Sequence, residues 1–358
     1  MKKILCLIDG LGSGGAQRQL VGLSALLKSK EYDVSLMWYH KISFFQPFLE
    51  EQGVRCIHLL PQKRFLKCLS IYQAIKREKP DIVIAYLGGP CIISCLLKIA
   101  GVKYKLIVSE RNTTQCPNIR EKIRFALYRF ADAIVPNSYS QMRFLQSQYP
   151  YLANKITPIT NFVDIGKYKP TVPWTRGKTF NILIVGRINP QKNVLCFMYA
   201  VAELKNKGVG VHFDWYGGKH DLDYHEKVNS LYKSLDISDM LAFYEPVQHI
   251  EQYYSQADAF CLPSLYEGFP NVICEAMSSG LPILCSNVCD NPDIVKDGYN
   301  GLLFDPNNYI DIADKITTLY NMEEDSLLEM RFKSRKIAIE KFKADVFVNK
   351  YLDLIEKL

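Results

Sequence analysis

Apolar runs of strand length alternate with helical stretches along the whole chain, and this alternation limits the possible folds more than any other feature. The runs are continuously apolar, which is typical of strands buried on both faces of a parallel sheet. Strands joined through helices form parallel, doubly wound sheets with helices on both sides. We expect strands near residues 4–8, 34–38, 56–60, 82–86, 106–108, 133–135, 182–185, 212–216, 242–244, 259–262, 283–285 and 302–304.

The chain length favours two domains, because 358 residues exceed the roughly 150 residues that a single domain usually has. The polar, proline-containing segment 166–178 is the natural linker. We therefore predict an α/β protein with two doubly wound, Rossmann-like domains, over residues 1–165 and 166–344. Ligands of such sheets bind beyond the carboxyl ends of the strands, so we expect the site in a cleft across which the two domains face each other.

Cysteine content and hydropathy indicate a cytoplasmic protein. The 11 cysteines include no pair with metal-binding spacing, and an odd number cannot all close into intramolecular disulfides, so a reducing compartment is the simplest explanation. The longest uncharged stretch, residues 82–97, contains Gly88, Gly89 and Pro90. It is shorter than the roughly 20 residues that a membrane span needs, so we expect no transmembrane helix.

Two carboxylates follow the expected strand at residues 259–262. The segment EGFPNVICE begins at Glu267 and ends at Glu275. Pro270 suits the first turn of a helix and Gly280 suits its end, which places Glu267 in a loop and Glu275 in the helix. The free N–H groups and positive dipole end of this helix point into the loop, where a phosphate or a sugar hydroxyl fits.

A second segment carries the complementary charge. NILIVGRINPQKN, residues 181–193, is an apolar strand that ends at Gly186 and is followed by Arg187 and Lys192. Arginine offers a planar fork of donors and lysine a compact point charge. Two such cations at one strand end can hold a diphosphate.

Together with DGYNGLLFDP at residues 297–306, these two segments resemble the C-terminal half of the retaining GT-B glycosyltransferases, specifically glycosyltransferase family 4. The resemblance spans nearly the whole chain and implies the GT-B fold. It implies that Arg187 and Lys192 hold the donor diphosphate and stabilise the charge that grows on the leaving group. It also implies that the last helix, residues 345–358, crosses back to the N-terminal domain.

The same resemblance gives the carboxylates their roles. Glu267 would meet the transferred sugar, and Glu275 would accept hydrogen bonds from the ribose hydroxyls of the nucleotide. The other donor-binding residues would be Gly186, Gly268, Phe269 and Asn271. The alternatives are a plain loop charge for Glu267, a helix-surface carboxylate for Glu275 and a surface cation for Arg187.

The loop GLGSGG, residues 10–15, matches the spacing of a dinucleotide fingerprint directly after a strand. That fingerprint also needs an acidic residue about 20 positions further on, at the end of the second strand, to bind the ribose. Here the second strand ends in Trp38, Tyr39 and His40, so we discount NAD and expect no cofactor. The family resemblance assigns the loop to the acceptor, with Gly14 and Gly15 permitting close approach. A tight turn without a ligand is the alternative.

After the fifth expected strand the chain departs from the family. Many members have a histidine there, whereas this chain reads VSERNTT, with Glu110 and Arg111. Some polysaccharide-building relatives look similar at this position. We therefore expect Glu110 and Arg111 to bind the acceptor, with a structural ion pair at the strand end as the alternative.

Charge is divided unevenly along the chain. Residues 1–165 carry 23 Lys and Arg against 11 Asp and Glu, a net charge of +12, whereas the rest carries −5. This imbalance favours contact between the N-terminal half and an anionic membrane surface. Nucleic acid is the other candidate polyanion, but no helix-turn-helix, zinc or RNA-binding signature accompanies the charge, so we expect none to bind.

The helical segment 118–133 makes the membrane contact more specific. Its spacing assigns five apolar residues to a buried stripe: Ile119, Ile123, Ala126, Leu127 and Phe130. The opposite, membrane-facing side would carry Arg124, Phe125, Tyr128 and Arg129. Aromatic side chains among cations suit a lipid headgroup layer, and an ordinary solvated basic face is the alternative.

The triplet DLD at residues 221–223 has the Asp-x-Asp form that metal-dependent glycosyltransferases of the other major fold use. Two carboxylates early in a helix are explained by capping and by the helix dipole. Because Arg187 and Lys192 already supply positive charge for a diphosphate, we predict a metal-independent enzyme without a metal site.

The resemblance implies a retaining glycosyltransferase in which the acceptor attacks the face from which the donor phosphate departs. We expect transfer from a nucleotide-sugar, with a UDP-sugar favoured, to a polyprenyl-diphosphate-linked saccharide. The enzyme would lie peripherally on the inner face of the cell membrane, in capsule or O-antigen assembly. The alternatives are an NAD-dependent oxidoreductase that uses the glycine loop and a non-catalytic GT-B protein that binds sugar nucleotides.

Overall fold

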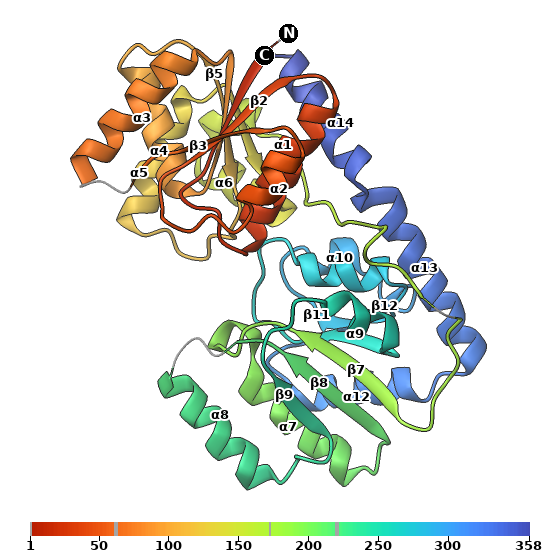
Figure 1. Ribbon diagram of the computed structural model, residues 1–358. Helices are drawn as coiled ribbons and strands as arrows, with labels where there is room; N and C mark the ends of the chain where they lie inside the picture. Colours follow the sequence, from red (N-terminus) through yellow and green to blue (C-terminus); the bar gives the residue numbers. More distant parts are fainter. Residues whose placement is uncertain (1, 61–63, 172, 219–221) are drawn as a thin grey trace. The chain divides into compact units, whose positions relative to one another are not determined.

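The computed structural model describes residues 2–60, 64–171, 173–218 and 222–358, which form two compact units (Figure 1). The first unit contains Met1–Asn161 and Ala344–Leu358, and the second contains Phe162–Lys343. The boundary thus falls a few residues before the expected one at 165/166. Val163 and Tyr168 are buried in the core of the second unit, so segment 166–178 begins as packed structure rather than as a free linker.

The first unit is built on a six-stranded parallel sheet with the order β3-β2-β1-β4-β5-β6. Its central strand β1 pairs with β2 and β4 on either side, with Ile4 opposite both Val34 and Ile82. Strands β1, β2, β4 and β6 are almost entirely buried because helices cover both faces of the sheet. The strands are β1 Lys3–Leu7, β2 Asp33–Trp38, β3 Arg55–His58, β4 Ile82–Tyr86, β5 Lys105–Glu110 and β6 Ala133–Pro136.

One core of the first unit lies between the sheet and helices α3 to α6. On the other side α1 and α14 lie side by side, as Figure 1 shows. Helix α14 is anchored to the sheet by a hydrogen bond of 2.8 Å between the hydroxyls of Tyr86 and Tyr351. The helices are α1 Gly15–Ser29, α2 Gln46–Glu51, α3 Arg64–Glu78, α4 Gly88–Ile99, α5 Ile119–Leu127, α6 Tyr139–Gln148 and α14 Ala344–Glu356.

The second unit repeats this architecture, with the parallel order β12-β11-β10-β7-β8-β9. Helices α7, α8 and α12 enclose one core, and α9, α10 and α13 enclose the other. The strands are β7 Phe180–Val185, β8 Val211–Tyr216, β9 Leu241–Tyr244, β10 Ala259–Leu262, β11 Ile283–Ser286 and β12 Gly301–Phe304. The helices are α7 Val194–Asn206, α8 Leu222–Leu235, α9 Ile250–Gln256, α10 Asn271–Ser278, α11 Asn291–Ile294, α12 Tyr309–Tyr320 and α13 Glu324–Phe342.

The predicted α/β class with two Rossmann-like units is confirmed, and each expected strand coincides with an observed one. Within the described residues, no helix is both long enough and apolar enough to cross a membrane.

Helix α5 presents the opposite face to the core from the one predicted. Phe125 and Tyr128 are fully buried, whereas Ile119, Ile123 and Phe130 are 77%, 54% and 41% exposed. The spacing of apolar residues in a helix does not show which of its faces is buried when the other face has polar partners in the core. Here the ring of Phe125 packs against those of Phe144 and Tyr149, so the aromatic side chains take the interior positions.

The prediction that Arg124, Phe125 and Tyr128 face a membrane is therefore wrong. Tyr128 donates a hydrogen bond to the buried carboxylate of Glu110, and Arg124 forms an ion pair with the same group. A buried carboxylate must be compensated, and this requirement turns both polar side chains inward. Arg129 alone of the four lies on the surface, with its guanidinium over the ring of Tyr151.

Candidate functional site

The carboxyl ends of β7 and β10 bring the predicted cation loop and carboxylate loop together in the second unit. These strands are neighbours, so Lys192 and Glu267 meet although 75 residues separate them. The Lys192 Nζ lies 2.5 Å from Glu267 Oε1, and the two side chains are only 12% and 10% exposed. A pair this well shielded from water is held firmly, and Glu267 is not the plain loop charge of the alternative interpretation.

The backbone around Lys192 is shaped by its own sequence. A short 3-10 turn spans Pro190–Lys192, and the Asn189 side chain caps it by accepting a hydrogen bond of 3.1 Å from the Lys192 N–H. Asn193 then takes a left-handed conformation with φ of 59° and starts α7. Asparagine tolerates this conformation better than most residues.

Gln191 fastens the two loops to each other. Its carbonyl accepts a hydrogen bond of 2.9 Å from the Leu265 N–H, and its side-chain amide donates one of 2.9 Å to the Tyr266 carbonyl. Gln191 is not among the predicted site residues, because its position between Pro190 and Lys192 carries no catalytic signature. Only the pairing of β7 with β10 shows which loop it contacts.

Glu275 lies inside α10 and is only 6% exposed, which excludes a solvated helix-surface carboxylate. The Tyr254 hydroxyl donates a hydrogen bond of 3.2 Å to Glu275 Oε2. Tyr254 belongs to α9, which packs on the same face of the sheet. Sequence reasoning missed this residue, and no local motif points to it.

The start of α10 differs from expectation at two positions. The Asn271 N–H donates to the Phe269 carbonyl over 3.0 Å, so this N–H is already used within the protein. The Phe269 side chain is buried and packs against the ring of Phe342. Of the predicted donor-binding residues, Phe269 therefore contributes its side chain to the core and has only its backbone to offer a ligand.

The chain segments that follow β7 and β8 approach each other so closely that glycine is needed there. The Gly186 N–H donates to the Tyr216 carbonyl over 3.0 Å, and a Cβ on Gly217 would lie 1.8 Å from the Gly186 carbonyl oxygen. Only glycine fits at Gly217. Arg187 follows directly and is exposed, and among the described residues it has neither a hydrogen bond nor an ion pair. It is therefore a cation available to a ligand. Gly217 was not predicted as a site residue. The pair of glycines directly after the expected strand at 212–216 is the sequence feature that could have pointed to it.

In the first unit the predicted acceptor residues Glu110 and Arg111 have separate partners. Glu110 is 3% exposed, and its Oε2 lies 3.0 Å from Arg124 Nη2. Burial raises the pKa of the Glu110 carboxyl, and the Arg124 guanidinium opposes this shift. Arg111 donates to Asn161 and lies 4.5 Å from the centre of the Tyr86 ring. Glu110 and Arg111 thus do not form the ion pair of the alternative interpretation, and both side chains are buried.

The glycine loop of the first unit leads into α1, whose N-cap is Gly14. This cap has no side chain to bind the free N–H groups of the first turn, and Ser13, Gly14 and Gly15 are exposed. A Cβ on Gly14 would lie 2.5 Å from the Gln17 side-chain oxygen. The backbone here is open to a ligand on the acceptor side.

The metal-like triplet is only partly visible, because Asp221 lies outside the described residues. Asp223 lies in the first turn of α8, where a carboxylate interacts favourably with the helix dipole. Among residues 2–60, 64–171, 173–218 and 222–358, no group of three or more His, Cys, Asp and Glu residues is arranged to hold a metal ion.

Comparison with known proteins shows the family to which the chain belongs. The family model described as Glycosyl transferases group 1 matches residues 173–340, and the one described as Glycosyltransferase Family 4 matches residues 13–167. Because these two models together match most of the chain and the structure has two Rossmann-like units, the chain is a GT-B glycosyltransferase. It belongs to the family 4 type.

Two curated relatives match most of the chain. One, from Campylobacter jejuni, is GalNAc-alpha-(1->4)-GalNAc-alpha-(1->3)-diNAcBac-PP-undecaprenol alpha-1,4-N-acetyl-D-galactosaminyltransferase. It is 28% identical over 338 residues, 90% of each chain. Another, from Escherichia coli, is UDP-Gal:alpha-D-GlcNAc-diphosphoundecaprenol alpha-1,3-galactosyltransferase, 25% identical over 95% of this chain and 93% of its own.

Among solved structures, HepE of Anabaena in complex with UDP and glucose superposes with a TM-score of 0.87 over 100% of both chains. Its sequence identity of 18% supports the shared fold and no more.

Proposed function

We propose that this glycosyltransferase moves a sugar from a UDP-sugar to a polyprenyl-diphosphate-linked saccharide during assembly of a surface polysaccharide such as capsule or O-antigen. The observation that carries the proposal is the meeting of Lys192 and Glu267 at 2.5 Å. Arg187 follows the same strand as Lys192, β7, and has no ion pair among the described residues. The curated relatives with matching length act on undecaprenyl-diphosphate-linked sugars, and one uses UDP-galactose by name.

The donor diphosphate fits between Arg187 and Lys192. Arg187 has no ion pair with any described residue, and Lys192 can share its charge between Glu267 and a phosphate oxygen. As the bond between the anomeric carbon and the phosphate oxygen breaks, its electron pair stays on the diphosphate, and two cations stabilise the resulting charge. This electrostatic role needs no metal ion, which supports a metal-independent reaction.

Retention of configuration follows if the acceptor hydroxyl attacks from the face that the diphosphate leaves. The new bond forms between the acceptor oxygen and the anomeric carbon, and the acceptor proton passes to the departing phosphate oxygen. Glu267, held by Lys192, would meet the hydroxyls of the transferred sugar. Backbone N–H groups of Gly268 and Phe269 lie beside it, and Gly186 lets the phosphate approach the end of β7.

The nucleotide would be held by Glu275, whose carboxylate is fixed by Tyr254. A buried carboxylate with a defined orientation suits two vicinal ribose hydroxyls. On the acceptor side, the open N-terminus of α1 at Gly14 and Gly15 suits the diphosphate of a lipid carrier. The side chains of Glu110 and Arg111 are buried, so they would support the acceptor-binding surface rather than form its exposed part.

The membrane contact is proposed for the face of α5 that the structure exposes. Ile119 and Ile123 are four residues apart and lie on one side of the helix, and Phe130 extends the apolar surface. Arg120, Lys122 and Arg129 are exposed near them. Apolar side chains that insert beside cations suit the inner leaflet, which carries anionic lipid. Peripheral binding on the inner face of the cell membrane would bring the enzyme to its lipid-linked acceptor.

The donor part of the proposal is tested by thermal shift with UDP, GDP, ADP and NAD. A nucleotide at a hundredfold excess over its Kd stabilises the folded protein by about 2.7 kcal/mol. We expect UDP to stabilise the wild type, Glu275→Gln to weaken the effect and the exposed control Glu329→Gln to leave it unchanged. Stabilisation by NAD alone would favour the oxidoreductase alternative.

The transfer part is tested with a radiolabelled UDP-sugar and a polyprenyl-diphosphate-linked saccharide. UDP binding without transfer to any lipid-linked acceptor would favour the non-catalytic alternative. Membrane contact is tested by flotation with vesicles that contain phosphatidylglycerol. Ile123→Glu should reduce flotation, and Phe332→Glu, at a still more exposed apolar position in the second unit, should not.

A further inference from the structure

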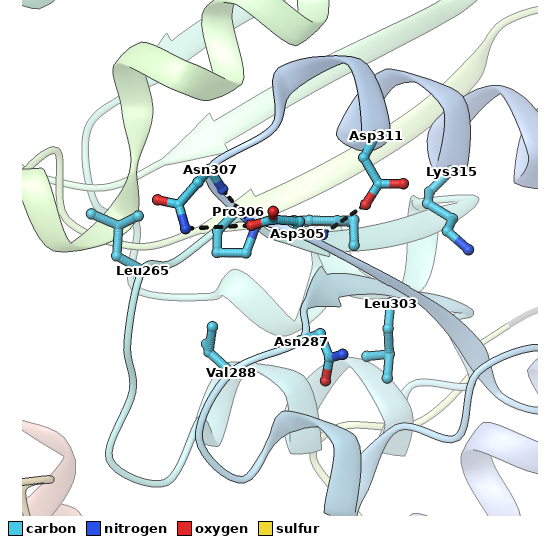
Figure 2. Close-up of a pocket in the computed structure, with 10 residues that line it drawn as sticks. Leu265, Asn287, Val288, Leu303, Asp305, Pro306, Asn307, Asp311 and Lys315 are labelled. Carbon is cyan, nitrogen blue, oxygen red and sulfur yellow. Dashed lines mark hydrogen bonds between the residues drawn. The ribbon is translucent and has the colours of Figure 1, made fainter.

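A cavity of about 710 Å³ opens beside the proposed donor site, at the carboxyl ends of β11 and β12 (Figure 2). Asn287 follows β11, and Asp305 and Asn307 follow β12. Asp311 and Lys315 line the cavity from the first two turns of α12. None of these polar residues belongs to the donor machinery described above.

The wall of the cavity continues into the loops that hold Lys192 and Glu267. Leu265 lines the cavity, and its N–H donates to the Gln191 carbonyl over 2.9 Å. On the other side, the Asn193 side chain donates a hydrogen bond of 2.6 Å to the carbonyl of Pro306, another lining residue. A molecule in the cavity would therefore contact residues that are hydrogen-bonded to the proposed catalytic loops.

Several polar atoms of the cavity remain available to a ligand. One oxygen of Asp305 accepts from the Asn307 N–H over 2.9 Å, and Asp311 Oδ2 accepts from the Asp305 N–H over 2.7 Å, as the dashed lines in Figure 2 show. Within the described residues, the second oxygen of each carboxylate, the Asn287 amide and the Lys315 ammonium have no such partner. Both donors and acceptors thus face the cavity.

The carboxylates, amides and ammonium that line the cavity indicate which chemical class of ligand can bind there. Two carboxylates against one ammonium give a net negative charge, which disfavours a phosphate or a nucleotide. The described residues offer no cluster of three metal-ligating side chains, so a cation is not favoured either. An uncharged sugar satisfies the groups, because each hydroxyl both donates to a carboxylate and accepts from an amide or ammonium. Leu265, Val288 and Leu303 supply apolar surface for its C–H groups.

We propose that this cavity is a saccharide subsite that holds a non-reacting sugar unit of the lipid-linked acceptor. The inference rests on the proposed function, since it assumes an acceptor with more than one sugar. It assigns part of the acceptor's recognition to the second unit. The enzyme would then measure glycan length as well as the identity of the reacting sugar.

Direct binding provides a test that does not depend on turnover. The probe is a lipid-free N-acetylhexosamine trisaccharide observed by saturation-transfer difference NMR with the full-length protein. Asn287→Phe fills the cavity from an exposed position, and Asp314→Asn, on α12 but paired with Lys207 at the surface, is the control. We expect saturation transfer with wild type and control and its loss in Asn287→Phe, with the UDP thermal shift retained in all three. Equal saturation transfer in Asn287→Phe would overturn the subsite.

A kinetic test distinguishes the acceptor glycan from the donor sugar as occupant. Polyprenyl-diphosphate-linked mono- and trisaccharides serve as acceptors, and Asp311→Asn serves as a second, milder variant. We expect the acceptor KM for the trisaccharide to rise roughly tenfold, as loss of a hydrogen bond to a charged group implies, with the monosaccharide value unchanged. A rise in the donor KM, or equal effects on both acceptors, would overturn the inference. Absence of transfer by the wild type would instead refute the proposed function and leave the NMR result to decide the subsite.

Discussion

Replacement of Arg124 by methionine should destabilise the first unit in a pH-dependent way. Glu110 is 3% exposed, and its carboxylate is compensated by Arg124 at 3.0 Å and by the Tyr128 hydroxyl. The Arg124 side chain is itself only 14% exposed, so solvent screens the pair little. Removing one partner of a buried pair costs about 3–5 kcal/mol of unfolding free energy. We expect a loss of this size for Arg124→Met at pH 8.

The sign of the pH dependence follows from the Glu110 carboxyl. Burial already raises its pKa, and loss of the Arg124 guanidinium raises it further. A carboxyl with a raised pKa binds its proton more tightly in the folded than in the unfolded state. The free energy of unfolding therefore falls as the pH rises from about 4.3, the ordinary glutamate value, through the raised pKa. Arg124→Met should lose less stability at pH 5 than at pH 8.

Urea denaturation of the wild type and the variant at pH 5 and pH 8 measures this difference. The double variant Glu110→Gln/Arg124→Met removes both charges and keeps an oxygen for the Tyr128 hydroxyl, so it should recover most of the loss at pH 8. Arg129→Met, at an exposed arginine two positions beyond α5, is the matched control and should change stability by less than about 0.5 kcal/mol. An equal loss at both pH values would refute the electrostatic reasoning and indicate lost packing of the arginine stem.

Three further predictions concern the proposed donor site. Lys192→Met should lower kcat by about 10²- to 10³-fold in the radiolabel transfer assay, because a preorganised charge at the leaving group is lost. An unchanged kcat would show that Lys192 does not stabilise the leaving group. Tyr254→Phe should weaken UDP binding by a factor that corresponds to about 1 kcal/mol in titration calorimetry, with kcat little changed, because Glu275 loses one hydrogen bond; equal UDP affinity would show that the hydroxyl does not orient Glu275. Gly217→Ala should prevent UDP binding or folding of the second unit, as seen by thermal shift and circular dichroism, because its Cβ would lie 1.8 Å from the Gly186 carbonyl oxygen; native behaviour would contradict this close approach.

The order of strands and helices could be predicted from the sequence because the signal is local and repeated. Continuous apolar runs specify strands buried on both faces, and helical stretches between them impose parallel pairing. The positions of the two proposed donor loops follow from the same pattern, since each begins where a buried strand ends. Gly186 and Arg187 after β7, and Glu267 before α10, were found in this way.

The orientation of α5 could not be predicted in the same manner. Its sequence contains an aliphatic stripe with Ile119 and Ile123 and an aromatic one with Phe125 and Tyr128, and helical periodicity fits both. The choice depends on Glu110, a buried carboxylate on β5 that requires a hydroxyl and a guanidinium beside it. Such a requirement is absent from the helix's own sequence.

The sequence by itself determined the α/β architecture, the two sheets and the chemical character of the residues at their edges, because these depend on local periodicity and residue type. The tertiary structure alone decided which side chains meet. Lys192 reaches Glu267, Gln191 binds the Leu265–Tyr266 backbone and Tyr254 orients Glu275 only because parallel pairing places their strands and helices together. Contacts between residues so far apart in the chain are set by packing, which no local pattern encodes.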